Sequence, residues 1–297
     1  MVPGADQILF VINPKAGTRH KRNIQDQLLA SLDPDRFQVH LAYTEYEGHA
    51  FEISRKAVQD RVPYLVAVGG DGTVNECASS LVATQSTLGI IPLGSGNGLA
   101  RDLGVPLEIE KALQVMNHHA IKTIDCGATD DGYFFCTAGV GFDAYISERF
   151  TQSKHRGLMG YLRKVVEEFL IYENQEYHVE LPGQARSCKA FSITFANAAQ
   201  FGNNAFISPH ADITDGKLDM CIVKDYPKHL GLSLGLRLFN RSIHKSRYVE
   251  IIRLEEAVIK CPHSCVYHMD GEVKQLDGSE LKVKVVPQAL RVMVPKV

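Results

Sequence analysis

The sequence has little net charge and no long hydrophobic run. Its 32 Lys and Arg nearly balance 34 Asp and Glu, so no overall electrostatic field attracts nucleic acid, and any anion site must be local. No apolar stretch approaches the ~20 residues of a membrane span. The first residues also lack the basic segment and apolar core of a secretory signal. We therefore expect a cytoplasmic protein that associates with membranes only peripherally.

Length and cysteine content set two further limits. The chain of 297 residues exceeds the ~100–150 residues of a typical domain, so we expect two domains. Seven cysteines are scattered along the sequence, and this odd number is typical of reduced thiols in a cytoplasmic protein.

Up to about residue 124, expected strands and helices alternate. The expected strands cover residues 7–12, 37–44, 64–69 and 87–94, and the expected helices cover residues 23–32, 48–60, 73–82 and 98–103. This alternation predicts a parallel sheet with helices on both faces. Ligands of such sheets bind beyond the carboxyl ends of the strands.

From about residue 125, short runs alternate apolar and polar residues, as in YFFCTAGVGF at 133–142 and KAFSITFANA at 189–198. They predict antiparallel β-structure, a sandwich or a barrel. Helical patterns at 157–172 and 227–239 interrupt these runs. Apolar residues stand beside basic ones there, so these helices either bind an anionic membrane surface or cover the β core.

Glycines gather where the third expected strand ends, in GGDGT at 69–73. An Asp-Gly pair alone predicts only a turn. Here the glycines lie between a buried strand and a helix start, where backbone N–H groups favour an anion. The Gly-Lys-Ser/Thr of a Walker A is missing, and Asn75 stands where a dinucleotide fingerprint has its third glycine. We interpret the loop as a phosphate site, with Asp71 facing Mg²⁺ or a substrate hydroxyl.

A second glycine-rich turn, GSGNG at 94–98, follows the next strand. It predicts another backbone nest for an anion, to which Ser95 adds a hydroxyl and Asn97 an amide. The alternative is a flexible loop that Asn97 caps. Two such loops on adjacent strand ends make that alternative weaker.

The second half contains a hairpin signal, Asp270-Gly271, followed by Glu272. Either carboxylate is placed to act as general base for a hydroxyl nucleophile, and a plain hairpin turn is the alternative.

Another Asp-Gly pair lies in HADITDGKLDM at 210–220, among Asp212, Asp215 and Asp219. Oxygen ligands at this spacing suit a hard cation, although a solvated turn explains the spacing equally well.

Taken in order, these motifs resemble the diacylglycerol kinase catalytic domain family, which includes bacterial diacylglycerol kinases and the sphingosine and ceramide kinases. The matching residues are Asn13-Pro14 with Gly17, GGDGT with Asn75-Glu76, PLGSGN at 92–97, Asp215-Gly216 and Asp270-Gly271-Glu272. The resemblance implies three segments. They are a NAD kinase-like three-layer α/β nucleotide-binding domain with a parallel sheet at 1–125, an antiparallel β-sandwich that binds lipid at 126–284 and a return strand at 285–297.

The resemblance also implies a reaction in which ATP phosphorylates a lipid hydroxyl with the help of Mg²⁺. Glu272 matches the family's proton acceptor, and Asp71 and Asp270 match its other essential carboxylates. The implied nucleotide-binding residues are Asn13, Pro14, Lys15, Ala16, Gly17, Thr44, Gly70, Asp71, Gly72, Thr73, Val74, Asn75, Glu76 and Ser95, to which the loop pattern adds Asn97. A structural Mg²⁺ of bacterial members maps to Asp215 with main-chain oxygens of Asp212 and Lys217.

The sequence departs from the bacterial diacylglycerol kinase pattern at two positions. Ser95 replaces the usual threonine, and Gly98 stands where an aspartate is expected. GSGNGLA is closer to the sphingosine and ceramide kinase branch. The acceptor, diacylglycerol or a sphingoid or ceramide lipid, therefore stays open.

Two other functions are compatible with this scaffold. A NAD kinase shares the GGDGT loop, but its asparagine-glutamate pair lies far downstream, whereas Asn75-Glu76 follows the loop directly. A catalytically silent lipid-binding protein has no need of Asp71, Asp270 and Glu272. We therefore expect a lipid kinase that meets its substrate at a membrane surface. No nucleic acid partner is expected, and a homodimer is one assembly that the sequence leaves open.

Overall fold

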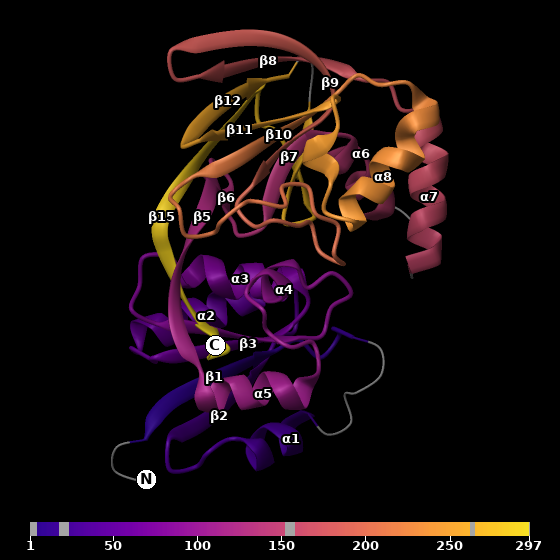
Figure 1. Cartoon of the computed structure of the whole chain (residues 1–297). Coiled ribbons are helices and arrows are strands. Elements are labelled where there is room, and N and C mark those ends of the chain that lie inside the picture. Colours follow the sequence, from indigo (N-terminus) through magenta and orange to yellow (C-terminus); the bar gives the residue numbers. More distant parts are fainter. Residues whose placement is uncertain (1–4, 18–23, 152–157, 262–264, 297) are drawn as a thin grey trace. The chain divides into compact units, whose positions relative to one another are not determined.

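The computed structural model describes residues 5–17, 24–151, 158–261 and 265–296. The chain forms two compact units, the first from Met1–Cys126 and Pro287–Val297 and the second from Gly127–Val286. Figure 1 shows the helices and strands of each unit.

Parallel strands form the sheet of the first unit. They are β1 (Asp6–Ile12), β2 (Phe37–Tyr43), β3 (Tyr64–Gly69), β4 (Thr87–Pro92) and the last part of β15 (Glu280–Val294), in the spatial order β2-β1-β3-β4-β15. β3 and β4 are almost entirely buried, as expected of central strands that are covered on both faces. The last part of β15 extends the sheet, because Arg291 and Val292 pair in parallel with Thr87 and Leu88.

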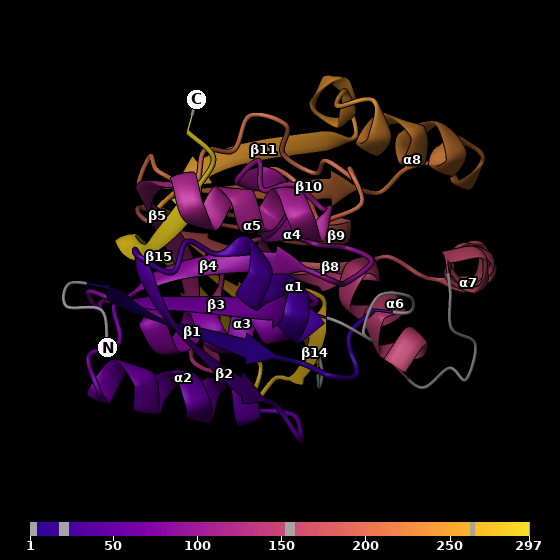
Figure 2. The same cartoon turned by 90° about the horizontal axis from the view of Figure 1, so that it is seen from below.

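Helices cover both faces of this sheet (Figure 1, Figure 2). α2 (His49–Gln59) and α3 (Asp71–Leu81) pack against each other on one face, and α1 (Ile24–Ser31) and α5 (Ile109–His118) pack together on the other. The short helix α4 (Gly98–Asp102) follows β4. The predicted three-layer α/β fold is confirmed for this unit.

Antiparallel strands build the second unit. The long strand β9 (Gln184–Ala196) pairs with β8 (Gln175–Leu181) along its first half, and with β7 (Thr137–Gly141) and β10 (Leu218–Lys224) along its second half. The remaining strands are β5 (Ala120–Thr129), which begins in the first unit, β6 (Gly132–Phe134), β11 (Val249–Leu254), β12 (Glu256–Lys260), β13 (Val266–Met269), β14 (Glu272–Gln275) and the first part of β15. The predicted antiparallel β domain is confirmed.

The alternating sequence pattern of these strands produces the core of the second unit. Tyr177, Phe195, Met220, Ile259 and Tyr267 come from different strands and are buried in one cluster. Successive side chains of a strand point to opposite faces, so one apolar row from each strand builds this core. Burial of each such side chain contributes roughly 1.5–3 kcal/mol to folding.

Helices of the second unit lie on one side of its β-structure (Figure 1). They are α6 (Phe142–Thr151), α7 (Leu158–Ile171) and α8 (Gly231–Phe239), with 3₁₀ turns at Lys228–Leu230 and Ile243–Lys245. The expected strand YFFCTAGVGF was wrong at its end, because β7 stops at Gly141 and Phe142 begins α6. Phe142 and Ile146 pack with Tyr172, and the ring of Phe142 stacks on Phe191 at 4.6 Å. Tertiary packing therefore overrides the local pattern.

Candidate functional site

The carboxyl ends of β1, β3 and β4 are neighbours, and each continues into a predicted loop. We call these the Asn13 loop (residues 13–17), the Asp71 loop (69–73) and the Asn97 loop (94–98). The N–H of Asn13 donates to the carbonyl of Val68 at 3.0 Å, and the N–H of Leu93 donates to the carbonyl of Gly69 at 2.7 Å. The parallel sheet therefore brings together loops that are widely separated in sequence.

The side chain of Asn13 fixes its own loop and contacts the next one. Its Oδ1 accepts the N–H of Lys15 at 2.9 Å, and its Nδ2 donates to Oγ1 of Thr73 at 3.1 Å. Gly17 ends the loop with φ 74°, and a Cβ there would lie 3.0 Å from the carbonyl oxygen of Leu93. A glycine is needed at this position both for backbone conformation and for space.

Lys15 and Thr44 lie at the neighbouring ends of β1 and β2. The Nζ atom of Lys15 donates to the carbonyl oxygen of Glu45 at 3.4 Å, and the N–H of Thr44 donates to the carbonyl of Ile12 at 2.9 Å. Thr44 is buried, whereas Lys15 is exposed. The Lys15 ammonium is thus accessible to an anion beside these loops.

Asp71 connects the Asp71 loop to the Asn97 loop. Its Oδ2 accepts the backbone N–H of Asn97 at 2.9 Å, and its Oδ1 accepts that of Gly98 at 2.7 Å. These N–H groups belong to the start of α4, where a carboxylate is favoured. A carboxylate oxygen can accept more than one hydrogen bond or metal contact. The structure therefore gives Asp71 a positioning role in addition to the predicted one.

The two glycine-rich loops touch backbone to backbone. A Cβ on Gly94 would lie 2.8 Å from Cα of Gly70, and a Cβ on Gly96 would lie 2.8 Å from Oδ2 of Asp71. Neither distance is compatible with a side chain unless the neighbouring atoms move. These glycines serve close packing as well as conformational freedom.

Asn97 determines the conformation of its own loop. It has a left-handed φ of 51°, its Oδ1 accepts the N–H of Gly94 at 3.0 Å and its Nδ2 donates to the carbonyl of Gly94 at 2.8 Å. Nε of Arg101 donates to the carbonyl of Gly96 at 2.9 Å. The Asn97 amide, which we expected to face a ligand, thus holds the loop, and Ser95 at the tip is exposed. Their contacts to a nucleotide remain predictions.

The start of α3 has the properties of an anion site. The helix begins at Asp71 after Gly70, and the N–H groups of a first helical turn have no acceptor within the helix. Together with the helix dipole they favour a phosphate group. Gly72 adds no side chain there, and Thr73 and Val74 are buried.

Asn75 and Glu76 lie within α3, beyond the Asp71 loop. Oε1 of Glu76 accepts the N–H of Gly48 at 3.1 Å and Oε2 accepts that of Ala50 at 3.0 Å, so this carboxylate holds the start of α2. Oδ1 of Asn75 accepts the hydroxyl of Ser79 at 3.2 Å. A structural role thus accounts for Glu76, and its predicted contact with a nucleotide is not required to explain its position.

In the second unit, Asp270 anchors the β13–β14 hairpin. Asp270 and Gly271 have φ of 48° and 86°, as the Asp-Gly signal predicts for a two-residue hairpin turn. The Asp270 carboxylate accepts the backbone N–H groups of Phe135 (2.9 Å), Cys136 (2.8 Å) and Thr137 (3.0 Å). Its geometry is that of a positioning residue for the turn that precedes Glu272.

Glu272 begins β14 immediately after this turn. Its side chain is 43% exposed, and Oε2 lies 3.9 Å from Nζ of Lys274. A partly exposed carboxylate on a rigid hairpin is accessible to a substrate hydroxyl and able to accept its proton. The structure brings Asp270 and Glu272 together, as the sequence predicts.

In the acidic loop at 212–219, the guanidinium of Arg253 already pairs with two carboxylates. Oδ1 of Asp215 accepts the N–H of Lys217 at 3.0 Å, and Oδ2 lies 3.5 Å from Nη1 of Arg253, which also pairs with Asp219 at 3.2 Å. Among the residues that the structure describes, no three His, Cys, Asp or Glu side chains are placed to hold a metal ion. A Mg²⁺ ion here would use Asp215 and main-chain oxygens of Asp212 and Lys217, and would compete with Arg253.

Sequence reasoning missed Asp143, a partly buried carboxylate on α6. Its Oδ2 accepts the hydroxyl of Thr194 at 2.5 Å. Burial raises the pKa of Asp143 to about 6, and hydrogen bonds from Thr194 and Ser192 oppose this rise. The missed boundary between β7 and α6 hid this residue, because Asp143 lies in the first turn of the unpredicted helix.

His268 on β13 is a second buried polar side chain that sequence reasoning did not select. Tyr267 and Met269 on either side of it belong to the apolar core, so the imidazole points to the opposite face. Within the described ranges, neither ring nitrogen has a hydrogen-bond partner. Burial lowers the pKa of His268 to about 4, so the ring is neutral at pH 7.

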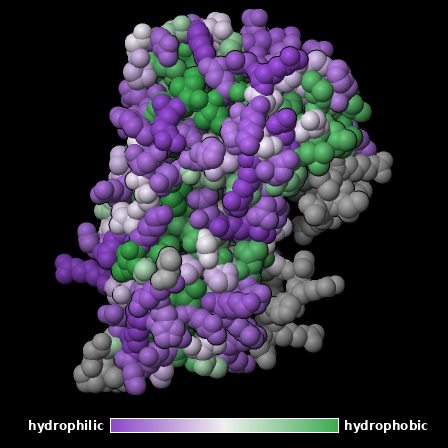
Figure 3. All heavy atoms as spheres, in the orientation of Figure 1, coloured by the Kyte–Doolittle hydropathy of each residue, from purple (hydrophilic) through white to green (hydrophobic). Residues whose placement is uncertain are grey.

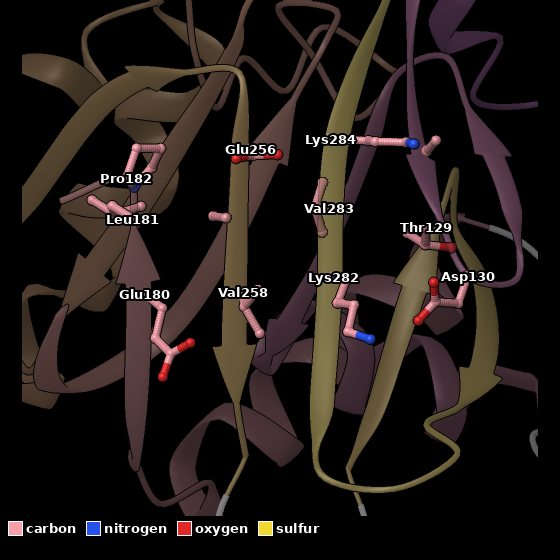
Figure 4. Close-up of a pocket in the computed structure, with 12 residues that line it drawn as sticks. Thr129, Asp130, Glu180, Leu181, Pro182, Glu256, Val258, Lys282, Val283 and Lys284 are labelled. Carbon is pink, nitrogen blue, oxygen red and sulfur yellow. The ribbon is translucent and has the colours of Figure 1, made fainter. Parts of the chain in front are cut away.

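The second unit also has a pocket of about 500 Å³ (Figure 4). Glu180, Val258 and Lys282 lie side by side there on β8, β12 and β15, where they occupy directly paired positions. Side chains of both charges line the opening, and none of the predicted site residues is among them. We assign this pocket no part in the predicted chemistry.

Comparison with known proteins decides the family. The model of the diacylglycerol kinase catalytic domain matches residues 7–129, and that of the YegS C-terminal NAD kinase beta sandwich-like domain matches residues 136–294. The chain belongs to the diacylglycerol kinase catalytic domain family. Membership of this family makes it a lipid kinase-like transferase and implies that it uses a nucleotide.

Similar proteins match nearly the whole length of this chain. A protein named "Probable lipid kinase YegS-like" from Yersinia enterocolitica is 28% identical over 97% of this chain and 96% of its own length. An uncharacterized protein of Synechocystis is 31% identical over 96% of this chain and 70% of its own length. The solved structure of a diacylglycerol kinase from Bacillus anthracis matches with a TM-score of 0.76 at 21% identity, over 97% of each chain. This last match shows that the fold is shared.

Proposed function

We propose that this protein transfers the γ-phosphoryl group of ATP to the hydroxyl group of a lipid at a cytoplasmic membrane surface. The observation that carries the proposal is the pair of hydrogen bonds that the Asn97 loop donates to the Asp71 carboxylate, at 2.7 and 2.9 Å. They hold two glycine-rich loops together beside the start of α3, where backbone N–H groups favour phosphate. The lipid kinase names of similar proteins support this proposal.

The first unit binds ATP in this proposal. N–H groups at the start of α3 and in the Asp71 loop bind phosphate oxygens, and the exposed Lys15 adds a positive charge. Asp71 would hold a Mg²⁺ ion, because its carboxylate can accept a metal contact besides its two hydrogen bonds. When bound, Mg²⁺ supplies charge neutralisation for the phosphoryl group.

The second unit supplies the proton acceptor. Glu272 takes the proton of the lipid hydroxyl, while the hydroxyl oxygen forms a bond to the γ-phosphorus. The bond between this phosphorus and the β–γ bridging oxygen breaks, and ADP leaves with the electron pair. The products are a lipid phosphomonoester, ADP and a proton on Glu272. The Asp71 loop and Glu272 belong to different units, so the proposed activity uses residues of both.

The acceptor class follows from the Asn97 loop. Gly98 adds no carboxylate beside Asp71, so this loop carries less negative charge than the bacterial diacylglycerol kinase pattern. We therefore include sphingosine and ceramide beside diacylglycerol as acceptors. Transfer to NAD⁺ would instead indicate a NAD kinase. No transfer to any acceptor would indicate a catalytically silent lipid-binding protein.

Transfer of ³²P from γ-labelled ATP tests the proposal directly. Purified protein with Mg²⁺ is offered diacylglycerol, monoacylglycerol, sphingosine, ceramide and NAD⁺, and the products are separated by thin-layer chromatography. We expect a labelled lipid, loss of turnover in Glu272→Gln and ATP binding close to wild type in that variant. Glu176→Gln, an exposed glutamate of β8 in the same unit, is the matched control. Labelled NAD⁺ alone, no labelled product, or near-normal turnover of Glu272→Gln would contradict the proposal.

A further inference from the structure

Exposed hydrophobic side chains concentrate on α7 and α8 of the second unit. Of the twelve large hydrophobic side chains that are exposed in the described ranges, six lie on these helices. They are Val166 (59% exposed), Leu170 (59%), Ile171 (67%), Leu232 (78%), Leu236 (58%) and Phe239 (56%). Figure 3 shows hydrophobic surface over α7 and α8.

α8 has two different apolar faces. Leu234 is buried, and Leu238 packs against the cluster that contains Ala196 and Cys221, so one face covers the β-structure. Leu232, Leu236 and Phe239 follow the spacing i, i+4, i+7 and form the exposed face. Covering the core therefore explains only two of the five large apolar residues of this helix.

The ends of α7 and α8 are fixed against each other. A Cβ on Gly231 would lie 2.3 Å from the ring of Phe169, so the start of α8 packs directly on α7. Nζ of Lys228 donates to the carbonyl oxygen of Leu170. The exposed side chains thus belong to one packed surface, which we call the α7–α8 surface.

The segment that contains α8 carries charge of one sign, whereas α7 also exposes Glu167. Residues 226–249 contain Lys228, Arg237, Arg241, Lys245 and Arg247 and no Asp or Glu, although the whole chain has slightly more acidic than basic residues. In the part of the chain that the structure describes, none of these five forms an ion pair with a carboxylate. Arg163 and Lys164 are the basic residues of the helix expected at 157–172, and their side chains lie outside the described part of the structure.

We propose that the α7–α8 surface binds an anionic lipid bilayer, with Leu232, Leu236 and Phe239 inserted among the acyl chains and the basic residues at the headgroups. Apolar side chains bordered by cations suit the interface of a negatively charged membrane. A second copy of this chain fits less well, because two cationic surfaces repel each other. No helix in the described ranges is long and apolar enough to span a bilayer.

This inference rests on the proposed function, because an enzyme with a lipid acceptor must reach a membrane. Its test measures binding to vesicles and needs no turnover. Wild-type protein is sedimented with vesicles of phosphatidylcholine alone and with vesicles that also contain phosphatidylglycerol. We expect binding to the anionic vesicles, weaker binding to neutral ones and a decrease with added NaCl. Leu232→Ser with Leu236→Ser should lower the partition constant at least about tenfold, since two leucines lose their transfer to the acyl region. Lys245→Glu with Arg247→Glu should lower it on anionic vesicles only.

Matched controls use exposed residues of the first unit. Leu29→Ser and Lys122→Glu should bind vesicles as the wild type does. Wild-type protein that ignores anionic vesicles, or a Leu232→Ser/Leu236→Ser variant that binds unchanged, would overturn the inference. So would a wild-type dimer in sedimentation velocity that this double variant converts to monomer. The vesicle result can be interpreted even if the phosphoryl transfer assay fails, because binding to vesicles does not require ATP.

Discussion

The Oδ1 atom of Asp71 lies 2.7 Å from the backbone nitrogen of Gly98, twenty-seven residues further along the chain. This hydrogen bond and its companion from Asn97 make Asp71 part of the framework that joins the Asp71 loop to the Asn97 loop. A carboxylate that only bound a metal would need neither contact.

Asp71→Asn should therefore destabilise the protein as well as inactivate it. An amide NH₂ replaces one acceptor oxygen and faces a backbone N–H group, which should lower the free energy of unfolding by about 1–3 kcal/mol. Urea denaturation measures this loss, and calorimetry measures ATP binding. Glu47→Gln removes an exposed charge in the same unit and should change neither. A stable Asp71→Asn protein without activity would assign Asp71 a purely chemical role.

Gly96→Ala should disrupt the same contact from the other side. Its Cβ would lie 2.8 Å from Oδ2 of Asp71, so either the loop or the carboxylate must move, at a cost of about 1–3 kcal/mol. Weaker ATP binding and a lower Tm are the expected results. Gly235→Ala is the matched control, because its Cβ meets open space within α8, and it should add up to about 1 kcal/mol of stability. Equal Tm values for the two variants would contradict this interpretation.

Asp270→Asn should loosen the β13–β14 hairpin. The carboxylate accepts three backbone N–H groups, and an amide can satisfy only those that face its oxygen, so about 1–3 kcal/mol of stability should be lost. Hydrogen exchange of the amides of Phe135, Cys136 and Thr137 should accelerate. Asp277→Asn, an exposed aspartate after β14, is the control. Unchanged exchange at those amides would show that Asp270 does not anchor the turn.

His268 should make the protein sensitive to acid. Burial lowers the pKa of its imidazole from 6.5 to about 4, so the unfolded chain binds a proton more readily than the folded one. Above pH 6.5 the imidazole is neutral in both states and no stability is lost. As the pH decreases towards 4, proton binding by the unfolded chain lowers the free energy of unfolding, by about 3 kcal/mol in total. His268→Phe removes the titration, and its urea midpoint should fall less between pH 7 and pH 4. Parallel pH profiles of the two proteins would exclude this role.

Mg²⁺ at the acidic loop should be detectable through thermal stability. If Asp215 holds the ion, Mg²⁺ should raise the Tm of the wild type relative to EDTA and leave Asp215→Asn unchanged. Arg253→Met retains Asp215 but removes the competing guanidinium, so its Mg²⁺ response should be larger. Equal Tm values with Mg²⁺ and EDTA in wild type and Arg253→Met would identify Arg253 as the cation of this loop.

The sequence was sufficient to predict both fold classes and the clustering of the Asn13, Asp71 and Asn97 loops. Parallel strands place their carboxyl ends at one edge, so loops after β1, β3 and β4 had to meet. The bond from Asp71 to Gly98 could not be predicted, because it depends on how closely two glycine loops pack. The alternation along β13 predicts to which face His268 points, but it does not predict whether a hydrogen-bond partner lies there. α6 was missed because its first residue, Phe142, continued the alternating pattern of the preceding strand, and only its packing against Tyr172 and Phe191 shows that it begins a helix.

β15 has a consequence for how the protein is made. Residues 287–294 of this strand belong to the first unit, although the ribosome adds them after the whole second unit. The edge of β4 beside them must therefore wait until these residues are synthesised before it is paired. A chain released near residue 286 would present that edge to other molecules, which favours aggregation. The codons for residues 287–297 thus decide whether the first unit, most of which is translated before the second, is ever complete.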